Sequence, residues 1–85
     1  MPAEDARRLY YQSRVNLVDL VARRDRLLRA LHRKMVDTGT DLASLSPADA
    51  ELLHQVDDLT AEIVSTTKLV NLYADQIGSP RVPSR

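Results

Sequence analysis

The chain has 85 residues, of which 44% are hydrophobic and 28% charged, and its twelve Lys and Arg residues balance twelve Asp and Glu residues. A chain this short forms at most one domain, whose core supplies only about 3–5 kcal/mol of stability. It contains no cysteine, which excludes disulfides and thiolate metal sites. No signal-peptide pattern and no apolar run of the roughly 18 residues needed for a membrane span is present, so we expect a soluble, cytoplasmic protein.

The zero net charge hides a division between the two halves of the chain. Residues 1–36 hold nine Lys or Arg residues and four acids, whereas residues 37–85 hold eight acids and three bases. A basic segment of this kind is typical of nucleic-acid binding. Two oppositely charged halves can also neutralise each other by packing together. Because both halves carry strong apolar stripes, we favour packing.

The first predicted helix covers residues from about 3 to 37, without an internal glycine or proline. Acidic Glu4 and Asp5 lie in its first turn, where the helix dipole favours negative charge. Apolar and small residues recur at helical spacing along one face. This stripe consists of Ala6, Tyr10, Ser13, Leu17, Leu20, Val21, Leu27, Leu28, Leu31 and Met35.

A turn is predicted at about residues 38–46, where Gly39 stands among Thr, Asp and Ser residues. A second helix then covers about residues 47–77. Ser46 is a favourable N-cap and Pro47 suits the first helical position. Gly78 can adopt the left-handed conformation that ends a helix. The hairpin therefore spans residues 1–78, and we expect residues 79–85 to form a disordered tail.

The second helix carries a sustained heptad pattern of alternating four- and three-residue steps, as in a coiled-coil seam. Its members are Leu52, Val56, Leu59, Ile63, Thr66, Val70, Tyr73 and Ile77. Folding back at the turn places residues whose numbers sum to about 83 opposite each other, so that Tyr10 faces Tyr73. The predicted fold is an all-α, antiparallel, coiled-coil-like two-helix hairpin.

A second apolar stripe lies away from this seam on the first helix, at residues 11, 15, 18 and 22. By the same register, it lies beside two apolar residues of the second helix that point off the seam. The predicted interface consists of Tyr11, Val15, Val18, Leu69 and Leu72. Exposed contiguous apolar surface usually marks an interface. We expect the hairpin to dimerise into a four-helix bundle, while binding of a different protein remains open.

Arg24 interrupts the apolar face of the first helix. We predict that its stem packs along the seam and that its head pairs with Asp58 or Glu62. Such a pair adds little stability, but it fixes the register of the two helices.

The segment "LVDLVARRDRL", residues 17–27, resembles the first helix of the small helical chorismate mutases. This resemblance implies an enzyme in which Arg24 grips the substrate. The chain departs from the pattern, because Met35 stands where that helix carries a lysine. The third helix that completes such an active site has no counterpart in these 85 residues.

Other chemistry is weakly indicated. Arg26, Arg29 and Arg33 form a basic ridge that could contact phosphates or an acidic partner, although that segment lacks aromatic residues for stacking. His32 and His54 are expected near each other, but a metal site needs three or four ligands. Threonine in a helical seam usually bonds its own helix backbone. We expect no cofactor and no metal.

These patterns together predict a non-enzymatic helical hairpin that acts as a protein-protein interaction module. It would be a small bacterial adaptor, regulator or assembly component working as a homodimer. Nucleic-acid or polyanion binding through the basic first helix is the alternative function. A small helical enzyme that uses Arg24 is the third.

Overall fold

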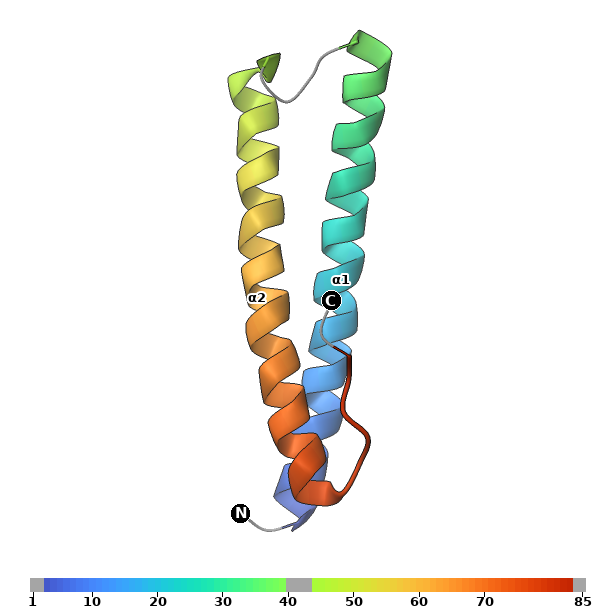
Figure 1. Ribbon diagram of the computed structural model, residues 1–85, viewed down its shortest axis with the longest axis vertical. Helices are drawn as coiled ribbons and strands as arrows, with labels where there is room; N and C mark the ends of the chain where they lie inside the picture. Colours follow the sequence, from blue (N-terminus) through green and yellow to red (C-terminus); the bar gives the residue numbers. More distant parts are fainter. Residues whose placement is uncertain (1–2, 40–43, 84–85) are drawn as a thin grey trace.

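The computed structural model describes residues 3–39 and 44–83. Helix α1 covers Ala3–Thr38 and helix α2 covers Pro47–Ile77, and within the described ranges all regular structure is helical. The two helices lie side by side and antiparallel in a rod of 53 × 17 × 16 Å (Figure 1). The predicted all-helical class and hairpin are confirmed. Part of the predicted turn, residues 40–43, lies outside the described residues.

Helix α1 ends at a glycine that takes a conformation other residues rarely adopt. Gly39 has φ of +66°, a left-handed backbone in which the absence of a Cβ removes the steric penalty. In the last turn, the Thr38 hydroxyl donates a hydrogen bond of 2.8 Å to the Lys34 carbonyl. A carbonyl near the end of the helix thereby gains a side-chain partner.

Both ends of helix α2 carry the predicted caps. The Asp49 backbone N–H donates to the Ser46 hydroxyl over 3.2 Å, and Pro47 occupies the first turn. At the other end Gly78 adopts φ 72° and ψ 24°, and the Ser79 N–H donates to the Ala74 carbonyl over 2.9 Å. This last bond is the mark of a Schellman ending, which turns the chain sharply away from the helix axis.

Contacts at both ends of the rod agree with the predicted register. Near the turn, the Lys34 ammonium lies 2.8 Å from the Asp49 carboxylate, and their residue numbers add to 83. This hydrogen bond is the main reason that the pKa of Asp49 lies below its usual value of 3.8. At the open end, Tyr10 packs against Val70 and Ala74 in a buried cluster.

The buried face of α2 is rotated relative to the predicted seam. Val56, Ile63 and Val70 are buried as expected. The second buried row, however, contains Thr67 and Ala74 in place of Thr66 and Tyr73, which are only partly buried. Small residues let the helices approach closely, whereas Tyr73 packs at the edge of the cluster. The Thr67 hydroxyl donates to the Ile63 carbonyl over 2.7 Å, so this threonine is satisfied within its own helix, as predicted.

After α2 the chain folds back along the hairpin and does not project into solvent (Figure 1). Val82 exchanges two hydrogen bonds with the Asn71 side chain, of 2.7 and 3.1 Å, and packs against the cluster around Tyr10. Arg81 donates two hydrogen bonds to the Asp75 carboxylate. We call residues 79–83 the return segment. The disordered tail expected from the sequence is wrong for these residues, and residues 84–85 lie outside the described part.

Candidate protein-interaction surface and the groove beside it

One side of helix α1 presents an exposed apolar strip, formed by Tyr11, Val15 and Val18. Their exposed fractions are 59, 68 and 69%, and together with Arg14 they line a shallow hollow. The Tyr11 ring meets the buried Tyr10 ring edge to face, with 5.3 Å between the centroids. The base of Tyr11 is therefore supported by the core while its outer side faces solvent. We call these three residues the α1 strip.

The other two predicted interface residues lie elsewhere. Leu69 and Leu72 are 40 and 53% exposed. With 3.6 residues per turn, both point roughly opposite to Thr67, which is buried against α1. They therefore lie on the outer side of α2, and the five predicted residues form two separate surfaces. Register states which residues share a level along the rod, but not on which side of it they lie.

A groove runs beside the α1 strip, between the two helices and the return segment. Its volume is about 480 Å³. Its walls are mostly aliphatic: Leu17, Val18, Val21 and Ala22 from α1, Ile63 and Val64 from α2, and Val82 and Pro83 from the return segment. The groove could not be predicted from the helical patterns, because one of its walls belongs to the return segment, for which a disordered tail was expected.

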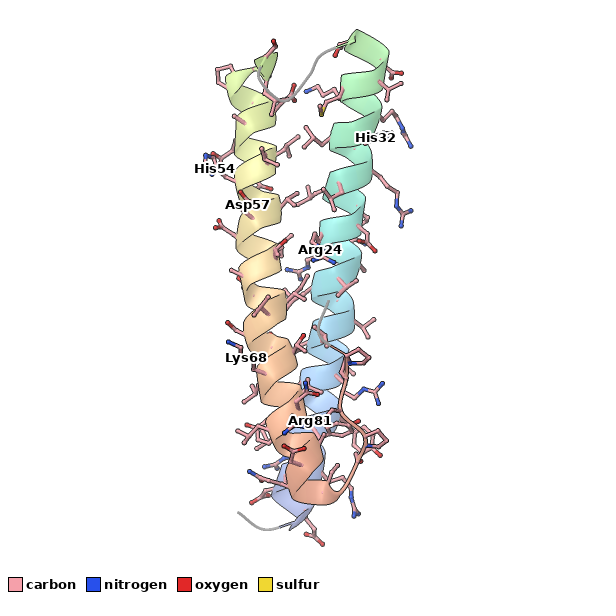
Figure 2. All side chains as sticks on the ribbon, viewed as in Figure 1. Arg24, His32, His54, Asp57, Lys68 and Arg81 are labelled. Carbon is pink, nitrogen blue, oxygen red and sulfur yellow. The ribbon has the colours of Figure 1, made fainter. Side chains whose placement is uncertain are left out.

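Arg24 extends from α1 toward α2 (Figure 2) and lines the groove. Its Nε is enclosed and has no hydrogen-bond partner, and no ion pair joins Arg24 to an acid in residues 3–39 and 44–83.

The predicted partners of Arg24 lie on another side of the hairpin. Asp58 lines a different hollow together with Arg23 and Arg26. Glu62, one turn along α2 from Asp58, is also exposed. The register-setting ion pair is therefore not formed. As with Leu69 and Leu72, the register predicts the level of a residue along the rod but not its side. Arg24 and Asp58 share a level but lie on opposite sides of the helix contact.

The basic ridge is divided between two surfaces. Arg29 and Arg33 line a hollow with Leu28, His32 and Val36 near the end of α1, whereas Arg26 lines the hollow that contains Asp58. All three arginines are exposed, and no ion pair in the described part of the chain involves them. Each hollow also contains a carboxylate, Asp58 beside Arg26 and Asp37 beside Arg29 and Arg33, so both surfaces combine basic and acidic side chains.

The two histidines do not converge. His32 and His54 point to opposite outer sides of the hairpin (Figure 2). In the described ranges no group of three or more His, Cys, Asp and Glu residues could hold a metal ion. Neither described helix is long and apolar enough to cross a membrane.

Comparison with known proteins found no match. No family model, no curated protein and no solved structure matches this chain.

Proposed function

We propose that this chain is a helical-hairpin protein-interaction module that works as a homodimer held by the α1 strip. The observation that carries the proposal is the exposure of three large apolar side chains, Tyr11, Val15 and Val18, on one side of a well-formed helix. Ala22 continues the strip with the same four-, three- and four-residue spacing. This is the spacing with which one helix packs along another.

The strip is complementary to itself. An antiparallel contact between two α1 helices, centred between Val15 and Val18, places Val15 of one copy against Val18 of the other. The same register places Tyr11 opposite Ala22, a large side chain against a small one. A two-fold symmetric contact requires this kind of self-matching surface.

Charges at the edge of the strip favour the same register. Arg7 and Asp25 are five helical turns apart and therefore lie on the same side of α1. In the antiparallel contact, Arg7 of each copy lies near Asp25 of the other, which gives two equivalent ion pairs at the rim. Pairs of this kind add little affinity, but they select orientation.

The resulting dimer contains four helices with the two α1 helices in contact. In this register Arg29 lies opposite Glu4 of the second copy, whereas Arg33 extends beyond the contact, stays uncovered toward the turn end and offers an exposed basic group to an acidic partner protein. We propose that the dimer acts as an adaptor, regulator or assembly component through this group. Catalysis does not enter the proposal.

Light scattering on size-separated protein tests the dimer. We expect a dimer for the unaltered chain and a folded monomer for Val15→Asp, because an unpaired carboxylate in an apolar contact weakens association by about a hundredfold or more. Val15 is exposed, so circular dichroism of the variant should stay helical. Leu72→Asp is the matched control and should remain dimeric. A helical Val15→Asp protein that still scatters as a dimer contradicts the proposal.

A gel-shift series separates this function from nucleic-acid binding. A phosphate-binding protein loses affinity steeply as salt rises. We expect no shift of duplex DNA or single-stranded RNA by the unaltered chain at physiological salt. A salt-sensitive shift that is lost in Arg29→Gln and Arg33→Gln would favour the polyanion-binding alternative.

A further inference from the structure

We infer that the groove beside the α1 strip binds an amphiphilic organic monocarboxylate, with its carboxylate on Arg24 and its apolar body along the aliphatic walls. This inference goes beyond the proposed function, because the groove and the α1 strip are distinct surfaces that meet at Val18. Arg14 borders both, and Ala22 and Asp25 line the groove as well as the edge of the proposed dimer contact. Val15, on which the dimer test rests, does not line the groove.

The side chain of Arg24 forms the charged end of the groove. A guanidinium is always charged and presents donors in a rigid fork that matches a carboxylate. Here the Nε donor is enclosed without a partner. A buried donor left unsatisfied costs free energy, and an acceptor that enters the groove recovers that cost. No acid in residues 3–39 and 44–83 forms an ion pair with Arg24, so a ligand that enters the groove can supply the acceptor.

The size and the walls of the groove suit the apolar body of a small molecule. The groove volume of about 480 Å³ is within the range of small-molecule sites. Leu17, Val21, Ile63 and Val64 line it and offer no hydrogen-bond donor or acceptor in their side chains. The lining also contains Arg14, Asp25 and Thr67, but the Thr67 hydroxyl donates to its own helix. Arg24 is therefore the enclosed donor left for one end of a ligand, and the aliphatic walls favour an apolar body.

The charged side chains of the groove limit the charge of the ligand. Asp25 also lines the groove, and its carboxylate repels a dianionic head such as a phosphate monoester. A second arginine, Arg14, is engaged with Tyr10: its Nη1 donates to the phenol oxygen over 3.1 Å, and its guanidinium carbon lies 5.6 Å from the ring centroid. Arginine stays charged in proteins, so Arg24 and Arg14 together with Asp25 give the lining a net charge of +1, which matches a ligand with a single negative charge.

The return segment completes the site. Val82 and Pro83 form the wall nearest the chain end, and two hydrogen bonds hold Val82 in place: the Asn71 amide donates to the Val82 carbonyl, and the Val82 N–H donates to the Asn71 side-chain oxygen. The groove is thus built from three segments of the chain.

Decanoate, used below the concentration at which it forms micelles, is the probe, and 1-decanol is its neutral counterpart. Titration followed by NMR should shift the Arg24 Nε–H signal with decanoate. Decanol should bind at least about tenfold more weakly than decanoate, because an alcohol cannot form the charge-assisted hydrogen bonds that a carboxylate forms with the guanidinium. The Val15→Asp monomer should bind decanoate as the unaltered chain does, which separates this site from the dimer proposal.

Arg24→Gln removes the charge while keeping a side chain of similar reach, and Arg23→Gln is the matched control because Arg23 is exposed and paired with Asp19. We expect Arg24→Gln to weaken decanoate binding by about tenfold or more and to leave decanol binding unchanged. Arg23→Gln should bind as the unaltered chain does. Equal affinity for decanoate and decanol, no detectable binding of decanoate, or unchanged decanoate binding in Arg24→Gln overturns the inference.

Discussion

At the scale of single residues, the charged side chains differ in what they hold together. Arg23 with Asp19 stays within one turn of α1, and such exposed pairs contribute little stability. The pairs that join separate segments have a clearer structural effect. Arg81 holds the return segment to α2 through Asp75. Lys34 joins the two helices near the turn.

The contact between Asp75 and Arg81 predicts a pH dependence for docking of the return segment. The hydrogen bonds from Arg81 hold the pKa of Asp75 below its usual value of 3.8. A carboxyl group whose pKa is lowered by docking favours the docked state above its usual pKa, and this contribution is lost as pH falls through the lowered value. We therefore expect the segment to stay docked at neutral pH and to loosen below about pH 4.

The measurement is the NMR signal of the Asn71 side-chain amide, whose hydrogen bonds to Val82 report docking. Asp75→Asn removes the charge and should loosen the segment already at neutral pH, with a weaker response to acid. Asp57→Asn is the control, because Asp57 is an exposed acid of the same helix without a contact to the segment. Identical acid responses of Asp75→Asn and the unaltered chain would show that another group controls docking.

At the scale of the helices, the N-cap of α2 predicts a local stability effect. Ser46→Ala removes the acceptor of the Asp49 N–H and should lower the free energy of unfolding by about 1 kcal/mol in chemical denaturation. Ser44→Ala, at an exposed position before the cap, should change it by less than about 0.5 kcal/mol. Equal effects of the two substitutions would mean that the cap bond does not stabilise the helix.

The helix ends could be predicted because their causes are local in the sequence. Ser46, Pro47 and Gly78 act on their own turns, and the structure places the end of α1 one residue beyond the predicted position. The rotation of the buried face of α2 could not be predicted from the pattern of apolar residues alone. A heptad pattern predicts Tyr73 at the buried position of the helix contact, whereas close packing of two helices favours the smaller Ala74 there.

The candidate site was predicted only in part, and again for a physical reason. Exposure of the α1 strip follows from helical periodicity, a property of one element. Arg24 and Asp58 can pair only if they lie on the same side of the contact between the helices. Matching two amphipathic stripes gives the level of each residue along the rod, but not the side on which it lies. The docked position of the return segment depends on a hydrogen bond between Asn71 and Val82, eleven residues later. No local sequence motif predicts this contact.

At the scale of the whole molecule, the rod is thin for its length. It measures 53 Å along its axis and 16–17 Å across, so each helix has one neighbour. The fully buried side chains gather at the open end, around Val70 and Ala74. A small core of this kind gives marginal stability, and the exposed α1 strip lies beside it. Covering the strip would therefore extend the core where it is already strongest.

This arrangement predicts that thermal stability depends on protein concentration. If folding is coupled to dimerisation, mass action raises the melting temperature as the chain becomes more concentrated. For a domain of this size we expect a rise on the order of 5–10 °C over a hundredfold increase in concentration. Calorimetry or circular dichroism over that range provides the measurement. Val15→Asp should melt at a lower, concentration-independent temperature, whereas Leu72→Asp should keep the dependence because Leu72 lies outside the α1 strip. A melting temperature of the unaltered chain that does not change with concentration would show that the hairpin is stable alone, and the strip would then need another occupant.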